Sequence, residues 1–181
     1  MSEDVKPGSV LSPGAAETVP AAAPTVDPDR LEQIARNHIL AALGVGLVPL
    51  PLVDVAGIFA VNLDLIRVLA KEYGVSFRAE WGKSALGALL GGVLPTALGG
   101  AVISLLKFVP VIGQTAGAVA FPVLAGAVTY AVYKVFVLHF ASGGTFLTFD
   151  PAKVQDYFRA QVEAGKGVAQ SLRDQGKTKT V

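Results

Sequence analysis

The chain has 181 residues, of which 52% are apolar and 16% charged, and its mean hydropathy is +0.54. A typical soluble domain has about 25% charged residues, so this composition favours a small integral membrane domain with polar ends. The net charge of +1 provides no strong field to attract nucleic acid, and the absence of cysteine excludes disulfides, thiolate catalysis and cysteine-ligated metals.

The N-terminal segment 1–26 is rich in proline and alanine and has no apolar period, so it is predicted to be a disordered tail. Helical order is expected from Asp27-Pro28, because aspartate caps a helix start and proline fits the first helical position. A first helix with apolar residues at helical spacing follows. It is predicted to stop at a rigid turn that contains Pro49 and Pro51.

A second helix is predicted from about Leu52 to Tyr73, with Gly74 as its stop. The uncharged run between His38 and Asp54 is short for a membrane span and is cut by two prolines. We therefore interpret the first two helices as an amphipathic hairpin that lies in the membrane interface or packs on the membrane pair described next. A shallow re-entrant insertion is the competing arrangement.

Two long uncharged segments follow, residues 85–106 and 108–133, and only Lys107 separates them. Because about 20 apolar residues suffice to cross a bilayer as a helix, the sequence predicts a two-helix transmembrane hairpin over residues 84–136. The predicted fold class is an all-α membrane protein in which amphipathic helices flank this hairpin.

Aromatic and basic residues border the hairpin on both sides. Trp81 and Lys83 precede it, and Tyr133 and Lys134 close it, as the headgroup layer of a bilayer favours. Bases lie outside the pair on both sides, whereas the tip has Lys107 alone. By the positive-inside rule both termini are predicted to face the cytoplasm.

Glycines recur at four-residue spacing in the hairpin, as Gly87 and Gly91 in the first span and Gly113 and Gly117 in the second. In lipid this spacing lets helix backbones approach closely. Packing within one chain is the preferred interpretation, and self-association of two copies is the alternative.

The C-terminal part is predicted to begin with an interfacial loop with buried aromatic side chains at residues 145–149. Asp150-Pro151 then repeats the helix-start pattern, and an amphipathic helix is predicted to end near Gly165 or Gly167. The predicted organisation is a disordered tail at 1–26, a helical membrane domain at 27–166 and a flexible basic tail at 167–181.

One short motif resembles a nucleotide site. Gly82-Lys83-Ser84 looks like the end of a phosphate-binding loop, but Phe77 stands where that loop needs a glycine, and no strand precedes it. No nucleophile with an adjacent base is recognisable either. The sequence therefore predicts no enzyme and no cofactor.

The two histidines, His38 and His139, lie in apolar surroundings without a second histidine at a ligand spacing. A metal site would need them to converge with Asp54 or Asp64. We interpret them instead as interfacial, hydrogen-bonded residues, and we predict no metal site.

The second helix carries the remaining polar candidates. An ionisable group at membrane depth is costly and would indicate function. We interpret Asp54 as a helix cap, and Asp64, Arg67 and Lys71 as a solvated or partner-facing surface, since their spacing puts them on one side of the helix. The full set of partner-facing or structural candidates is Pro49, Pro51, Asp54, Asp64, Arg67 and Lys71.

The order of these features resembles a known family. The pieces that match are Val48-Pro-Leu-Pro-Leu-Val-Asp54, the helix end Ala70-Lys-Glu-Tyr-Gly74, the apolar pair around Leu106-Lys-Phe-Val-Pro110-Val-Ile-Gly113, and Ala127-Val-Thr-Tyr130. Across residues 30 to 140 they resemble the bacterial membrane-associated domain of unknown function 697 (DUF697), which is often fused to, or encoded beside, Era-like GTPases. Many relatives have a glycine before the aspartate and a glutamine along the second helix, where this chain has Val53 and Asn62.

The resemblance implies an inner-membrane, mostly helical module that works with a GTPase. Because this sequence contains no GTPase domain, the partner is expected to be a separate chain. The family has no established catalytic residues to transfer.

Three functions are compatible with these features. The first is a membrane-anchored adaptor or scaffold that presents a cytoplasmic face to a GTPase or other partner. The alternative is a membrane-remodelling or pore-forming module that inserts a glycine-rich apolar hairpin. A transporter subunit ranks last, because the predicted spans contain few polar residues for a path through the bilayer.

Overall fold

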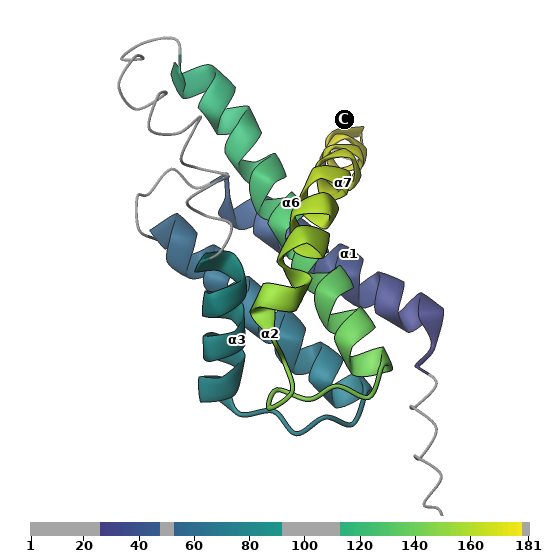
Figure 1. The fold of residues 1–181 in the computed structure, drawn as a ribbon. Helices are drawn as coiled ribbons and strands as arrows, with labels where there is room; N and C mark the ends of the chain where they lie inside the picture. The colour runs from purple at the N-terminus through teal and green to yellow at the C-terminus, as the bar shows by residue number, and fades with distance from the viewer. Residues whose placement is uncertain (1–25, 48–52, 92–112, 179–181) are drawn as a thin grey trace, which may run out of the picture.

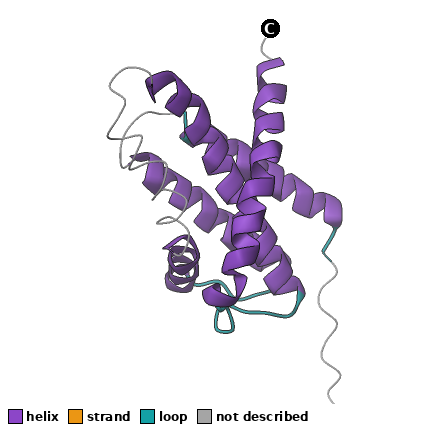
Figure 2. Ribbon diagram, turned by 45° about the horizontal axis from the view of Figure 1, so that its top comes forward, coloured by secondary structure: helices purple, strands orange, loops and turns teal. Residues whose placement is uncertain are grey.

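The computed structural model describes residues 26–47, 53–91 and 113–178. All regular secondary structure in these ranges is helical (Figure 2), which confirms the all-α prediction. The helices are α1 (Pro28–Val45), α2 (Val53–Glu72), α3 (Ala79–Gly91), α6 (Gly113–Ala141) and α7 (Pro151–Thr178).

The helix boundaries predicted from capping residues are confirmed at three places. Oδ1 of Asp27 accepts a hydrogen bond from the backbone N–H of Asp29 at 3.0 Å, and Oδ1 of Asp150 accepts one from the N–H of Ala152 at 3.1 Å. Each aspartate thereby satisfies a donor of a first helical turn. At the end of α2, Gly74 adopts a left-handed backbone with φ of 67°, which glycine tolerates best.

Helix α6 lies at the centre of the bundle, and α1, α2 and α7 pack around it (Figure 1). Its largest buried side chains, Phe136 and Phe140, lie near its C-terminal end. The ring of Phe136 stacks on Phe149 with 4.9 Å between centroids, and Phe140 meets Phe146 edge-on at 5.5 Å. The predicted loop at 145–149 is therefore present, and its two phenylalanines pack against the core but are only partly buried.

Helices α1 and α2 run antiparallel in a constant register. Arg30 Nε lies 3.2 Å from Oε1 of Glu72. About two turns further along α1, His38 Nε2 lies 3.3 Å from Oδ2 of Asp64. Beyond these, a methyl group added to Gly57 would lie 2.7 Å from Cγ1 of Val45. The contacts advance along α1 as they retreat along α2, so the end of α1 lies beside the start of α2.

Close helix contacts in this structure use glycines other than the predicted ones. A methyl group at Gly165 of α7 would lie 2.8 Å from the carbonyl oxygen of Ala127 on α6. At Gly87 and Gly91 an added methyl group meets no described atom within 4 Å, and both glycines are exposed on α3. The packing predicted for Gly87 and Gly91 is therefore not seen against the described residues. Gly113 and Gly117 lie in the first turns of α6, whose side-chain surroundings fall outside the description.

The transmembrane hairpin predicted over residues 84–136 is not shown by the described residues. In the described ranges, one helix is long and apolar enough to cross a membrane, at Ala120–Ala141 with mean hydropathy 1.7. Most of the first predicted span, residues 92–106, lies outside the description. The second predicted span continues past Tyr133 to Ala141, because its last turns bury phenylalanines in the core.

The predicted end of the last helix near Gly165 or Gly167 is too early, since α7 continues to Thr178. Gly165 packs on α6, and Ala169 is fully buried one turn later, so this part of α7 is held by packing rather than frayed. Residues 167–178 of the predicted basic tail are therefore helical. The predicted disordered tail, apart from Val26, lies outside the described residues, as do Pro49 and Pro51.

Candidate functional site

The polar residues predicted on α2 lie on its outer surface. Asp64, Arg67 and Lys71 are all exposed. Asp54 lies in the first turn of α2, and its side chain falls outside the description. Within the described part of the chain, neither Arg67 nor Lys71 belongs to a salt bridge, so both cations remain available to a partner.

Asp64 pairs across the helices rather than along its own. Its Oδ2 lies 3.3 Å from Nε2 of His38 on α1, and Nδ1 of the same ring lies 2.8 Å from the carbonyl oxygen of Ile34. Both ring nitrogens thus face oxygen atoms, one on the backbone of α1 and one on the side chain of Asp64. The hydrogen-bonded role predicted for His38 is confirmed, and so is that of His139, whose Nε2 lies 2.9 Å from the carbonyl oxygen of Thr145.

This histidine–aspartate pair does not extend to a metal centre. Among the described residues, no group of three or more histidine, aspartate, glutamate or cysteine side chains converges. Two ligands do not complete the four-coordinate shell that a structural zinc ion requires. The pair therefore links α1 to α2 as a hydrogen-bonded contact.

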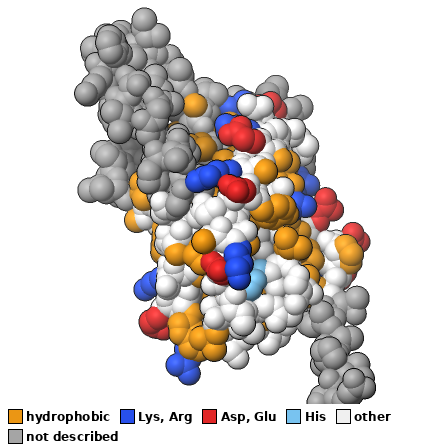
Figure 3. Space-filling model, viewed as in Figure 1, with side chains coloured by type: hydrophobic (Ala, Val, Ile, Leu, Met, Phe, Trp, Pro, Cys, Tyr) orange, Lys and Arg blue, Asp and Glu red, His pale blue; other side chains and the backbone are white. Residues whose placement is uncertain are grey.

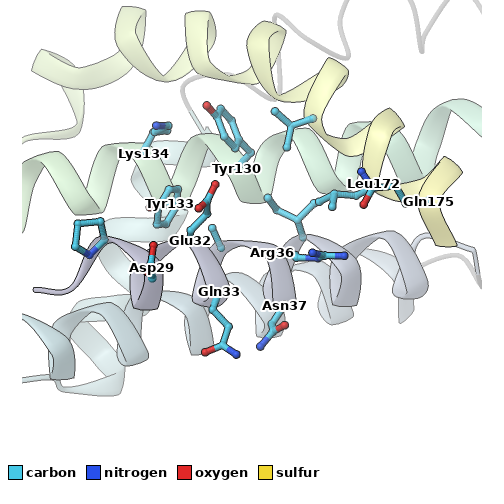
Figure 4. Close-up of a pocket in the computed structure, with 14 residues that line it drawn as sticks. Asp29, Glu32, Gln33, Arg36, Asn37, Tyr130, Tyr133, Lys134, Leu172 and Gln175 are labelled. Atoms are coloured by element: carbon cyan, nitrogen blue, oxygen red, sulfur yellow. The ribbon is translucent and has the colours of Figure 1, made fainter.

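A groove of about 1090 Å³ runs between α1, α6 and α7 (Figure 4). Tyr130 and Tyr133 of α6 line it, and Nζ of Lys134 lies 5.5 Å and 5.8 Å from their ring centroids. Glu32 and Arg36 of α1 face it from the opposite side. The remaining lining residues are Pro28, Asp29, Gln33, Ala35, Asn37, Ile39, Val168, Leu172 and Gln175.

The groove has an apolar floor and charged margins of both signs. Such a shape suits an amphipathic segment of another chain better than a small ligand, because small-molecule pockets are mostly apolar and more enclosed. Sequence reasoning missed it, since Tyr130, Tyr133 and Lys134 were interpreted as a membrane border. The signal that could have indicated it is the polar stripe on the first helix, which recurs at Asp29, Glu32 and Arg36.

Two amide side chains are buried with one oxygen unpaired. Asn62 of α2 donates from Nδ2 to the carbonyl oxygen of Ile58 at 2.8 Å, and Gln155 of α7 donates from Nε2 to that of Leu89 on α3 at 3.0 Å. No described group bonds Oδ1 of Asn62 or Oε1 of Gln155. The Gln155 bond ties α3 to α7.

Comparison with known proteins shows the family to which this chain belongs. The family model described as "Domain of unknown function (DUF697)" matches residues 26–166. The chain belongs to the DUF697 family. The matched range contains α1, α2, α3, α6 and the first half of α7, so it is wider than the segment from which the resemblance was recognised.

A DUF697 relative from Magnetospirillum gryphiswaldense is named "Magnetosome membrane protein 22". It is 37% identical to this chain over 143 residues, which cover 78% of this chain and 73% of the relative. No solved structure matches the chain. In the described part of this DUF697 chain, one long apolar helix, two exposed cations on α2 and an open groove beside α6 are the candidate functional features.

Proposed function

We propose that this DUF697 chain is a non-enzymatic, membrane-associated helical adaptor at the bacterial inner membrane. The observation that carries the proposal is the apolar segment Ala120–Ala141 of α6, which is 22 residues long. A helix of this length and composition is typical of segments that enter a bilayer. The name of the Magnetospirillum relative supports a membrane location.

The burial of α6 limits how this helix can meet lipid. In the bundle, 56% of its most apolar window is covered by the other helices. The remaining surface is free for contact with hydrocarbon. On this proposal α6 enters the bilayer from the cytoplasmic side without passing through it, so both termini stay cytoplasmic, the side that the bases outside the predicted spans favour.

The adaptor binds its partner through the outer surface of α2. Arg67 and Lys71 are exposed on that helix, and charged surface groups of this kind set the partner and the rate of association. The expected partner is a separate Era-like GTPase, as the family resemblance implies. Self-association through the exposed glycines Gly87 and Gly91 is the alternative use of the surface.

Membrane fractionation tests the anchored part of this proposal. The native protein should sediment with membranes and remain there after alkaline carbonate washing. Recovery in the soluble fraction would contradict an anchor.

Crosslinking in native membranes, followed by affinity purification, tests the partner. A GTP-binding chain should co-purify with the wild type and be lost from the double variant Arg67→Glu, Lys71→Glu. Lys153→Glu is the control for a charge reversal on another helix, since Lys153 is an exposed cation at the start of α7, where it pairs with Asp150. Equal recovery from all three proteins would contradict a docking role for α2.

A second candidate function is membrane remodelling or pore formation. It is supported by the central place of α6, an apolar helix that a bundle could release into lipid. Purified protein should then release dye from liposomes, and Gly87→Leu or Gly113→Leu should abolish the release. Intact liposomes at all protein concentrations would exclude this candidate.

A further inference from the structure

The charged residues of α1, α2 and α6 are sorted toward one end of the bundle. In the sequence, residues 39–53 contain no charged residue, and Asp54 is the only one before Asp64. Residues 113–133 are uncharged as well. The other halves of α1 and α2 carry acids and bases in almost every turn, at Asp29, Arg30, Glu32, Arg36, Asp64, Arg67, Lys71 and Glu72.

Contacts between helices bring the three uncharged stretches together. Val45 meets Gly57 on α2, and a methyl group at Gly46 would lie 2.8 Å from Cα of Pro122 on α6. Leu43 lies within 3.3 Å of a methyl group added to Gly126. We call residues 39–47, 55–63 and 120–129 the uncharged end; in Figure 1 it lies toward the upper left, where α2 and α6 begin.

Large apolar side chains are exposed at this uncharged end. Leu47 is 64% exposed and Val55 is 63% exposed, and Leu40 is also among the exposed large hydrophobic residues. In Figure 3 acidic and basic side chains are visible at the top of the described surface, where α7 ends, as well as in its middle and lower parts. Asp54, which precedes Val55 in the first turn of α2, is the one acid beside these residues, and the exposed leucine and valine side chains form a surface that water solvates poorly.

Polar residues border the uncharged end on the side that faces the rest of the bundle. The His38–Asp64 pair closes the uncharged stretch between α1 and α2, and on α6 the cation of Lys134 lies beside the rings of Tyr130 and Tyr133. Tyrosine rings next to a base are typical of the headgroup layer. On the α7 side, Ala169 packs against Gly126, and the Glu163–Lys166 and Arg173–Asp174 ion pairs lie before and after it, so this side of the bundle stays polar.

We infer that the bundle meets the bilayer end-on, with the uncharged end in the hydrocarbon and the His38–Asp64 pair and Lys134 at the headgroup level. The inference rests on the proposed membrane association and names the surface that makes it. The occupant is hydrocarbon rather than a protein groove or an anionic headgroup, because the exposed side chains of Leu40, Leu47 and Val55 are apolar and residues 39–47, 55–63 and 120–129 carry no charge.

The absence of cysteine allows a direct test with the full-length chain. Single-cysteine variants Leu47→Cys and Val55→Cys carry a fluorophore at the uncharged end, and Leu138→Cys and Leu147→Cys carry it at the opposite end. Leu138 and Leu147 are matched controls, since they are also large, apolar and exposed, at 52% and 77%. The labelled proteins are reconstituted into phosphatidylcholine vesicles, and quenching by doxyl-labelled lipid is compared with quenching by aqueous iodide.

Labels at 47 and 55 should be quenched by the doxyl lipid and protected from iodide, and labels at 138 and 147 should behave in the opposite way. Labels at 138 or 147 that are quenched by lipid as strongly as those at 47 would overturn the inference and leave the membrane proposal intact. Protein that fails to associate with vesicles at all would overturn both.

Charge insertion provides a second measurement that does not depend on labels. Leu47→Asp should lower the fraction of protein that floats with phosphatidylcholine vesicles at least tenfold, because a carboxylate is costly in hydrocarbon. Leu147→Asp should leave flotation unchanged. Equal loss in both variants, with circular dichroism showing both folded, would contradict the assignment of this end.

Discussion

The contact between α6 and α7 at Gly165 gives a prediction with an internal control. Replacing Gly165 by alanine puts a methyl group 2.8 Å from the carbonyl oxygen and 3.0 Å from Cα of Ala127. Both atoms belong to the backbone of α6, so no side chain can rotate away. The two helices must separate locally, and overpacking of this kind costs about 1–3 kcal/mol.

Alanine also has a favourable effect that must be subtracted. In a helix interior, Gly→Ala stabilises by roughly 0.5–1 kcal/mol because glycine loses more backbone entropy on folding. Gly167 isolates this effect: it lies in the same helix, is exposed, and an added methyl group meets no described atom within 4 Å. Gly167→Ala should therefore raise the free energy of unfolding by about that amount.

The difference between the two variants measures the contact itself, since the propensity effect cancels. Chemical unfolding of the detergent-solubilised protein, followed by circular dichroism, should place Gly165→Ala below Gly167→Ala by about 1–3 kcal/mol. Equal stability of the two variants would refute the reasoning, because it would mean that α7 does not lie on the backbone of α6 at Ala127.

Three further predictions concern the core. Phe136→Ala should lower the free energy of unfolding by about 3–5 kcal/mol, because the ring is fully buried and stacked. Leu147→Ala, at an exposed position, should change it by less than about 0.5 kcal/mol, and equal effects of the two variants in chemical unfolding would contradict the assignment of Phe136 to the core. Asn62→Leu should leave stability unchanged or raise it by about 1 kcal/mol, since Oδ1 of Asn62 is buried without a described partner, and a large loss would reveal one. Burial raises the pKa of Tyr73 above its ordinary value of 10.0. The stability that the protonated Tyr73 contributes is therefore fully present below that pH and is lost as the pH rises through the higher pKa of the folded state. Tyr73→Phe should reduce the loss of stability at alkaline pH, and a stability profile with an unchanged alkaline limb would contradict this.

Local signals predicted the helix starts and much of the secondary structure. Asp27-Pro28, Asp150-Pro151 and Gly74 mark boundaries through their own backbone chemistry, so neighbouring sequence suffices to read them. The family resemblance was likewise visible in short segments. These features depend on a few adjacent residues and need no knowledge of how helices pack.

Features that depend on packing were predicted less well. Gly165 and Gly167 look alike in the sequence, but one is covered by α6 and the other is exposed, so neither ends the helix. Asp64 was assigned to the bases of its own helix, whereas the antiparallel register with α1 brings it to His38. The groove beside Tyr130 needs three helices, so the polar stripe of the first helix could indicate only one of its walls.

The half-buried state of α6 affects the energetics of any release from the bundle. Lipid tails and the leucine, valine and phenylalanine side chains around α6 are similarly apolar, so transfer from one to the other exchanges two equivalent solvents. Little net hydrophobic free energy would accompany the exchange. Whether α6 stays in the bundle or enters the bilayer would then depend on the packing that it loses at Gly126 and Gly165. The close contacts at these glycines, rather than the hydropathy of the helix, would determine where α6 resides.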